Sequence, residues 1–230
     1  MIDSAMVGSL VNGGDTVAAE PTEPRLCRGV TLLIATHNAG KLRVFTALLR
    51  PYDLCVVGAA ARGIPEPEET GDDFGTNATL KARHGAVQSG LPSLADLWAV
   101  RCFLEGTPGV LSARWAGSAR DFKRAIGRVL AALEGASDRS AALVCALALA
   151  WPDCPEVVTT EGRIDGHIVA TPRGSGGFGY DSAFQPDGES ETFAEMTDAR
   201  KRNRDHRAAA FKALALSCFP LLSPDLESRS

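Results

Sequence analysis

The sequence lacks a surplus of positive charge. Its 230 residues carry 24 lysines and arginines against 28 aspartates and glutamates, which gives a formal net charge of -4 at pH 7. A protein that neutralises an array of phosphates or an anionic lipid surface needs clustered cations. We therefore expect binding neither to nucleic acid nor to a membrane, although a local cluster of cations can still hold one small polyanion.

Segments that direct a chain to or across a membrane are also lacking. The longest apolar run, Ala141 to Trp151, is too short to span a bilayer. Residues 1–28 have neither the basic start nor the apolar stretch of a signal peptide, and we expect them to form a disordered N-terminal extension. Residues 221–230 are expected to form a frayed tail. A cytoplasmic protein fits these features.

The six cysteines include no C-x-x-C pair. Their wide separation favours reduced thiols over a disulfide framework or a zinc site. Cys145 lies within the apolar run and is expected to be a small core residue.

Strand and helix signals alternate between residues 29 and 220, which indicates one α/β domain. Apolar and β-branched runs predict strands at 31–35, 54–57, 93–96, 141–151 and 157–164. Helical spacing and capping residues predict helices after Lys41, from Asp72 to about Ser89, over 122–133 and over 205–218. A turn is expected at Asp165 and Gly166, and a glycine-rich loop at 172–181.

The segment Thr36-His-Asn-Ala-Gly-Lys41 lies between the first predicted strand and a helix. Free backbone N–H groups and the positive end of the helix dipole favour an anion there. Thr36 and Asn38 add side-chain donors, and Lys41 adds a point charge. The Walker A pattern is absent. An ordinary turn capped by Asn and Gly is an equally good interpretation of this hexapeptide alone.

An acidic run, Glu66-Pro-Glu-Glu69, precedes the second predicted helix. Such a run is usually a solvated face beside a helix start. The sharper interpretation is a Mg²⁺ site, because hard cations bind carboxylate and phosphate oxygens together. Lys81 on the following helix is either a surface lysine or a group that reaches an anion at the Thr36 loop.

The glycine-rich loop contains two aromatic residues and ends in an acid. Phe178 and Tyr180 can stack on a planar base, and Asp181 can accept a hydrogen bond from a ring N–H. The alternative is a surface loop with a core-anchoring Phe. Lys201, His206 and Arg207 bring positive charge to the start of the last helix, where a solvated basic face is the simpler interpretation.

An ordered set of segments resembles the Ham1 family of inosine/xanthosine triphosphate pyrophosphatases. The set covers about residues 30–219, and its members are LLIATHNAGKL, EETGDDFGTNATLKAR, GLPSLAD, TPGVLSARWAG, PRGSGGFGYDSAF, TFAEMTD and DHRAAAF. The resemblance implies an elongated mixed β-sheet with flanking helices in two lobes, and a homodimer. It also implies Mg²⁺-dependent hydrolysis of ITP, dITP and XTP to the monophosphate and pyrophosphate. A Maf-like pyrophosphatase is less compatible with the GFGYD and HR segments.

The resemblance assigns roles to individual residues. It implies catalytic roles for Asp96 and Lys41, and metal binding by Glu69 and Asp96. The phosphates would be held by Thr36, His37, Asn38, Ala39, Gly40, Lys41 and Lys81. The 6-oxo purine would be recognised by Phe178, Gly179, Tyr180, Asp181, Lys201, His206 and Arg207.

Several positions depart from the family pattern, among them Thr76 and Ser182, and two departures concern the proposed site. Asp205 replaces a common Ser and adds a negative charge beside His206 and Arg207. In the segment SLADLWAVRCFLEG, Asp96 keeps the first Asp of the family's Ala-Asp-Asp-Ser-Gly-Leu pattern, whereas Leu97 replaces the second and Trp98 replaces the small Ser expected near the phosphates. The alternative function is therefore a nucleotide-binding member with impaired catalysis.

A shift of reading frame is one explanation for residues 97–103. Removing two bases from GAC-TCT-GGG-CTG-TGC-GTT, one encoding of Asp-Ser-Gly-Leu-Cys-Val, yields Leu-Trp-Ala-Val-Arg, the sequence of Leu97 to Arg101. A genuine change of sequence is the other explanation. Resequencing the gene distinguishes them.

Overall fold

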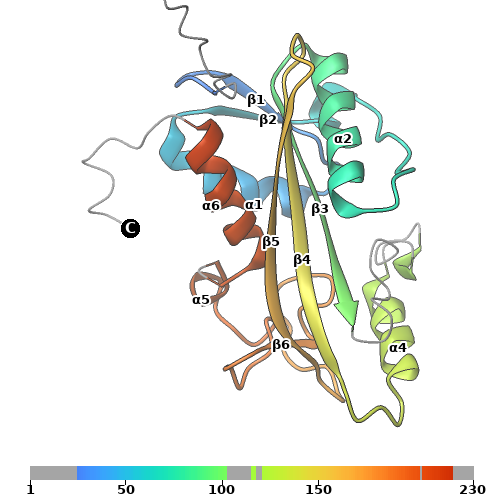
Figure 1. Cartoon of the computed structure of the whole chain (residues 1–230). Coiled ribbons are helices and arrows are strands. Elements are labelled where there is room, and N and C mark those ends of the chain that lie inside the picture. The colour runs from blue at the N-terminus through green and yellow to red at the C-terminus, as the bar shows by residue number, and fades with distance from the viewer. Residues whose placement is uncertain (1–24, 103–114, 118–120, 203, 220–230) are drawn as a thin grey trace, which may run out of the picture.

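The computed structural model describes residues 25–102, 115–117, 121–202 and 204–219. Its framework is a six-stranded sheet with the order β2-β1-β3-β4-β5-β6 (Figure 1). β1 pairs in parallel with β2 and β3, whereas the other neighbours are antiparallel. The strands are β1 (Thr31–Ile34), β2 (Cys55–Gly58), β3 (Ser93–Cys102), β4 (Ser140–Ala150), β5 (Val157–Ile168) and β6 (Phe184–Pro186).

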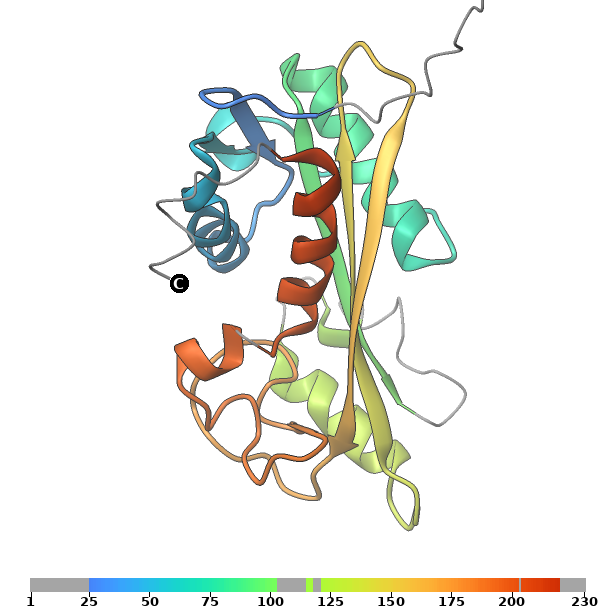
Figure 2. The same cartoon turned by 60° about the vertical axis from the view of Figure 1, so that its left-hand side comes forward.

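Helices cover both faces of this sheet. The long strands β4 and β5 run the length of the molecule and join two lobes (Figures 1 and 2). α1 and α2 lie in one lobe with β1 and β2, and α4 and α5 lie in the other with β6. The predicted elongated mixed sheet with two lobes is confirmed. The helices are α1 (Ala39–Leu49), α2 (Phe74–Ser89), α4 (Phe122–Ala132), α5 (Asp198–Arg202) and α6 (His206–Cys218), with 3-10 turns at Arg50–Tyr52 and Ala60–Arg62.

The core explains why the longest apolar run forms a central strand. Every residue of β4 after Ser140 is buried, because helices pack on both of its faces. One face, with Leu147 and Leu149, packs against α1 and α6. The other face carries alanines and packs against Ala78 and Ala82 of α2. Small residues on both surfaces allow α2 to lie close to the sheet.

The turn predicted at Asp165 and Gly166 is wrong. β5 continues to Ile168, and Gly166 pairs with Ala141 on one side and Pro186 on the other. A Cβ atom on Gly166 would lie 2.3 Å from the carbonyl oxygen of Gln185. The glycine is therefore required for the close approach of β6 and does not mark a turn.

The structure describes residues 25–28, which precede the predicted domain boundary at residue 29. The Leu26 backbone N–H donates to the carbonyl of Cys218 at 2.7 Å, and Leu26 is buried. Arg25 donates to the carbonyl of Phe219 at 2.9 Å. Residues 25–28 thus pack against the end of α6. The rest of the predicted extension and the predicted tail at 221–230 lie outside the described residues.

Two further observations concern membrane-spanning helices and cysteines. No helix in the described part of the chain has both the length and the apolar character needed to cross a membrane. Cys145 is fully buried, as predicted. The described cysteines Cys27, Cys55, Cys145, Cys154 and Cys218 are free thiols.

Candidate active site

β1 ends beside the first residues of β3, which leaves a gap beside the rest of β3. β1 pairs with β3 only through Ser93 and Leu94, so the following part of β3 has no strand on that side within the described residues. Asp96 lies at this gap, and its Oδ2 is 3.1 Å from Nζ of Lys41 at the start of α1. The Asp96 side chain is 1% exposed. The structure thus brings together the two residues predicted to be catalytic.

The Thr36–Lys41 loop is a capped helix start. The Asn38 side chain accepts hydrogen bonds from the backbone N–H groups of Gly40 at 2.8 Å and Lys41 at 3.2 Å, while the Asn38 N–H donates to Thr36 Oγ1 at 3.2 Å. The predicted capping is confirmed, and Ala39 is the first residue of α1. Phosphate binding by the loop stays a prediction.

The side chain of His37 has a different partner from the predicted phosphates. Its Nε2 lies 2.8 Å from the carbonyl oxygen of Ile64, and Nε2 of His84 lies 3.1 Å from the carbonyl oxygen of Pro65. Both rings therefore hold the loop that leads into the acidic run.

Lys81 is not a surface lysine. Its Nζ lies 2.6 Å from Glu69 Oε1 and 3.3 Å from Glu66 Oε1, and the residue is 6% exposed. Burial alone would lower the pKa of Lys81, but Glu69, Glu66 and Asp96 outweigh it and raise the pKa. Lys81 is therefore a charged group beside Asp96.

The carboxylates around Lys81 are the candidates for metal binding. No three His, Cys, Asp or Glu side chains of the described residues are grouped so that they could hold a metal ion. The predicted ligands Glu69 and Asp96 each contact a lysine. Two carboxylates suffice where phosphate and water oxygens complete the coordination of Mg²⁺.

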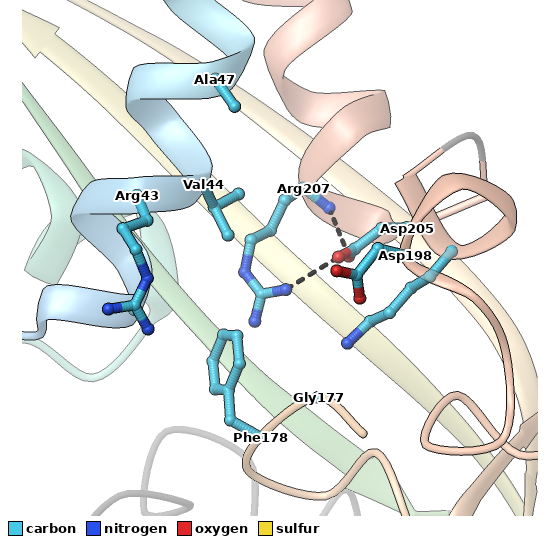
Figure 3. Close-up of a pocket in the computed structure, with 10 residues that line it drawn as sticks. Arg43, Val44, Ala47, Gly177, Phe178, Asp198, Asp205 and Arg207 are labelled. Carbon is cyan, nitrogen blue, oxygen red and sulfur yellow. Dashed lines mark hydrogen bonds and ion pairs between the residues drawn. The ribbon is translucent and has the colours of Figure 1, made fainter.

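A pocket of about 400 Å³ lies between α1 and the second lobe (Figure 3). Successive turns of one face of α1 form its first wall. The glycine-rich loop, α5 and the start of α6 form the opposite wall. The lining residues are Gly40, Arg43, Val44, Ala47, Gly177, Phe178, Asp198, Lys201, Asp205 and Arg207.

Two charged residues of this pocket were missed from the sequence. Arg43 follows Gly40 by three residues on α1, so helical spacing would have placed it on the same wall. Asp198 ends the family-like segment TFAEMTD, but no role was assigned to it and α5 was not predicted.

Arg207 is the buried cation of the pocket. It is 3% exposed, and its Nη1 donates to Asp205 Oδ2 at 2.8 Å. Its guanidinium carbon lies 4.7 Å from the ring centroid of Phe178, towards which the side chain reaches from α6 (Figure 3). Burial opposes the charge, but Asp205 outweighs that effect and raises the pKa of Arg207.

Lys201 also lines the pocket, and its charge lies near two aromatic rings. Nζ of Lys201 donates to Asp181 at 2.5 Å and lies 5.5 Å from the ring centroid of Phe178 and 5.4 Å from that of Phe193. The predicted base-binding residues Phe178, Lys201 and Arg207 are thus brought to one pocket.

The other predicted base-binding residues lie behind this wall. Tyr180 is fully buried and packs edge-on against Phe122 at 5.7 Å. Asp181 accepts a hydrogen bond from the Phe178 N–H at 2.6 Å and so shapes the loop. Gly179 packs on Trp98, and His206 is 1% exposed. Direct contact of these four residues with a base stays a prediction.

Asp205 supports the buried pair and does not disturb it. Its side chain caps α6 by accepting from the Arg207 N–H at 3.0 Å, and its Oδ1 lies 2.5 Å from Nδ1 of His206. Burial opposes ionisation of Asp205, but Arg207 and His206 outweigh it and hold the pKa far below its usual range. The negative charge that Asp205 adds beside His206 and Arg207 is therefore paired with both of these residues.

Leu97 and Trp98 point to opposite faces of β3. Side chains alternate along a strand, so Leu97 faces α2 and packs among its alanines, opposite to Asp96. Trp98 points to the same face as Asp96 but packs against the base-binding candidates Phe178 and His206. Residue 103 of the altered segment lies outside the described residues.

Comparison with known proteins agrees with this architecture. The Ham1 family profile matches residues 32–216. A dITP/XTP pyrophosphatase of Rhodospirillum centenum is 49% identical over 204 residues, which are 86% of this chain and 99% of that protein. A dITP/XTP pyrophosphatase of Caulobacter vibrioides is 47% identical and covers 83% of this chain and 99% of its own length.

Solved structures give the same result. A HAM1 protein from Coxiella burnetii superposes with a TM-score of 0.76 at 37% identity, covering 81% of this chain and 97% of its own. The dITP/XTP pyrophosphatase from Mycobacterium abscessus has a TM-score of 0.66 at 38% identity, with coverages of 80% and 98%. The profile match, the sequence identities and the shared fold all lead to one conclusion: this chain belongs to the Ham1 family.

Proposed function

We propose that the protein hydrolyses the non-canonical purine nucleotides dITP, ITP and XTP to the monophosphate and pyrophosphate. Two relatives that are 49% and 47% identical to this chain are dITP/XTP pyrophosphatases. The observation that carries the proposal is the arrangement of one cleft, in which Lys41 and Asp96 adjoin a pocket that contains the buried Arg207. A triphosphate and a polar purine fit the two ends of this cleft.

The phosphate end supplies cations and a base. Lys41 and Lys81 offset the charge of the phosphates. Asp96 accepts a proton from the attacking water, and its buried Oδ2 is held 3.1 Å from Nζ of Lys41. The water oxygen forms a new bond to phosphorus, the bridging bond between the α and β phosphates breaks, and pyrophosphate leaves.

Mg²⁺ is the proposed cofactor, and Asp96 and Glu69 are its proposed ligands. The oxygen donors of this end suit a hard cation, which would share the triphosphate oxygens and offset their charge. Lys81 holds Glu69 in place at 2.6 Å, so the carboxylate is already oriented.

The base end selects a 6-oxo purine. Arg207 and Lys201 present only hydrogen-bond donors, and Nε of Arg207 is buried without a hydrogen bond to any described residue. The 6-oxo group is an acceptor, whereas adenine presents an amino donor at that position. Burying two donors against each other leaves both unsatisfied, which disfavours ATP.

A nucleotide-binding role with impaired catalysis is not favoured. That alternative rested on the replacement of the family's second Asp by Leu97 and of its Ser by Trp98. Trp98 packs against Phe178 of the base end. Asp96 remains beside Lys41 as the available base. We further propose that the protein is cytoplasmic and forms a homodimer. Each chain would contribute a single domain of residues 29–220, against which residues 25–28 pack.

The test is product analysis with Mg²⁺ and, in parallel, ITP, dITP, XTP and ATP. We expect pyrophosphate and the nucleoside monophosphate from the first three substrates only. Release of orthophosphate, or equal turnover of ATP, would contradict the proposal. Binding of ITP without release of pyrophosphate would instead support the alternative of a nucleotide-binding protein with impaired catalysis.

A further inference from the structure

The indole of Trp98 packs directly against the buried cation of the base pocket. The guanidinium carbon of Arg207 lies 4.8 Å from the Trp98 ring and 4.7 Å from the Phe178 ring. The two rings are themselves in edge-to-face contact, with centroids 5.6 Å apart and an angle of 81° between their planes. Trp98, Arg207 and Phe178 therefore form one mutually supported group, which we call the aromatic clamp.

The clamp is fitted closely to its surroundings. The ring of Phe122, at the start of α4, stacks on the Trp98 ring with centroids 6.2 Å apart. The His206 ring centroid lies 6.0 Å from that of Trp98. A Cβ atom on Gly179 would come within 2.2 Å of the indole carbon Cη2. The indole thus fills the space that the glycine leaves, and it cannot shift without moving the loop that carries Phe178.

Arg207 depends on this contact for part of its stabilisation. The guanidinium has Asp205 as its only hydrogen-bond acceptor among the described residues. The negative faces of two aromatic rings stabilise a desolvated cation of this kind. They also fix its plane, so the donors on its pocket side keep one direction in the absence of substrate.

We propose that Trp98 is a positioning residue that presets Arg207 and Phe178 for an oxo-purine, and that it thereby sets the selectivity of the pocket. The inference rests on the proposed function. Its physical basis is preorganisation, because a donor held in place before binding pays no ordering entropy when the base arrives. Trp98 itself need not touch the nucleotide.

The main experiment compares W98F and W98S with the matched control W151F. Trp151 follows the end of β4, where Ala150 pairs with Ser93, whereas Trp98 pairs with Cys145 further along the same strands. Loss of an aromatic and a cation–π contact predicts about a tenfold rise in KM for ITP in W98S. It also predicts a similar loss of discrimination against ATP, whereas kcat stays within about threefold because phosphate contacts are retained. W98F keeps a ring and is expected to retain most of the selectivity, and W151F all of it.

Unchanged selectivity in both W98F and W98S would overturn the inference, as would an equal loss in W151F. If W98S is too unstable to purify, W98F and W98L provide the same comparison of ring against no ring. If the wild type neither binds nor hydrolyses ITP, the proposed function fails, but the clamp remains testable by unfolding.

The unfolding experiment is a double-mutant cycle of W98S and R207M, which needs no nucleotide. If Trp98 and Arg207 contact each other, W98S removes a contact in the wild type that R207M already lacks. We therefore expect W98S to lower the ratio of folded to unfolded protein about tenfold more in the wild type than in R207M. Equal effects in the two backgrounds would show that the residues are not coupled and would refute the clamp.

Discussion

The two ends of the cleft hold charge in different ways. At the phosphate end, Lys41 and Lys81 pair with carboxylates, of which Asp96 is 1% exposed and Glu69 26%. At the base end, Arg207 is 3% exposed and is enclosed by Asp205 and two aromatic rings. The first arrangement leaves the Glu69 carboxylate partly open to solvent. The second fixes one orientation of a cation before substrate arrives, so catalysis and selectivity are assigned to different electrostatic environments.

The largest expected effect is on the phosphate end, in D96N. Loss of a general base predicts a fall in kcat of about 10²–10⁴-fold, with the preference for ITP over ATP unchanged. The measurement is steady-state pyrophosphate release. The matched control is D165N, which alters an exposed pair with Arg163 and is expected to be neutral. More than a tenth of wild-type kcat in D96N would remove Asp96 from catalysis.

The next largest effect is on the base end, in R207M. Leaving Asp205 buried without its guanidinium predicts a loss of about 3–5 kcal/mol in the free energy of unfolding. Arg200 pairs with Glu189 at the surface, so R200M is the control, with an expected loss of about 0–1 kcal/mol. Urea denaturation measures both. Equal losses would contradict the contrast between a buried and an exposed arginine.

A smaller effect concerns the pH dependence of the base end. Burial lowers the pKa of His206 below its usual 6.5, and although Asp205 opposes the shift, Arg207 adds to it. As pH falls below about 6.5, the unfolded state binds a proton that the folded state does not, so the free energy of unfolding falls by at most about 1.4 kcal/mol per pH unit. H206Q is expected to remove this contribution. Identical pH slopes in H206Q and wild type would assign the dependence to other groups.

The smallest effect separates capping from anion binding at Asn38. N38A removes both cap hydrogen bonds and is expected to cost about 1 kcal/mol of unfolding free energy. N38D keeps a capping oxygen but places a negative charge at the proposed phosphate site, so we expect near-native stability with weaker ITP binding. Calorimetric unfolding and ITP titration give the two quantities. Native ITP affinity in N38D would leave the loop as a capped turn only.

The phosphate end was largely predictable because its residues are close in sequence or follow strand ends. The Thr36–Lys41 loop is marked by a strand, an Asn cap and a Lys within six residues. At the base end, the residue pattern indicated only the glycine-rich loop, and the roles of Lys201, His206 and Arg207 came from family resemblance. Trp98, Phe122 and Arg207 meet through the pairing of distant strands and the packing of α4 and α6, which local spacing does not encode. For the same reason, the sequence did not indicate the contact of Trp98 with Arg207 or the pairing of Asp205 with that residue.

The pairing of the cleft lysines has a consequence for specificity against other anions. Each lysine proposed to meet the nucleotide already contacts a carboxylate in the pairs Lys41–Asp96, Lys81–Glu69 and Lys201–Asp181. Entry of a triphosphate is therefore an exchange of partners within a nearly neutral cleft. Orthophosphate alone gains little from such an exchange, so the abundant small anions of a cell compete weakly. Affinity for the nucleotide is accordingly expected to vary less with ionic strength than it would in an open basic groove.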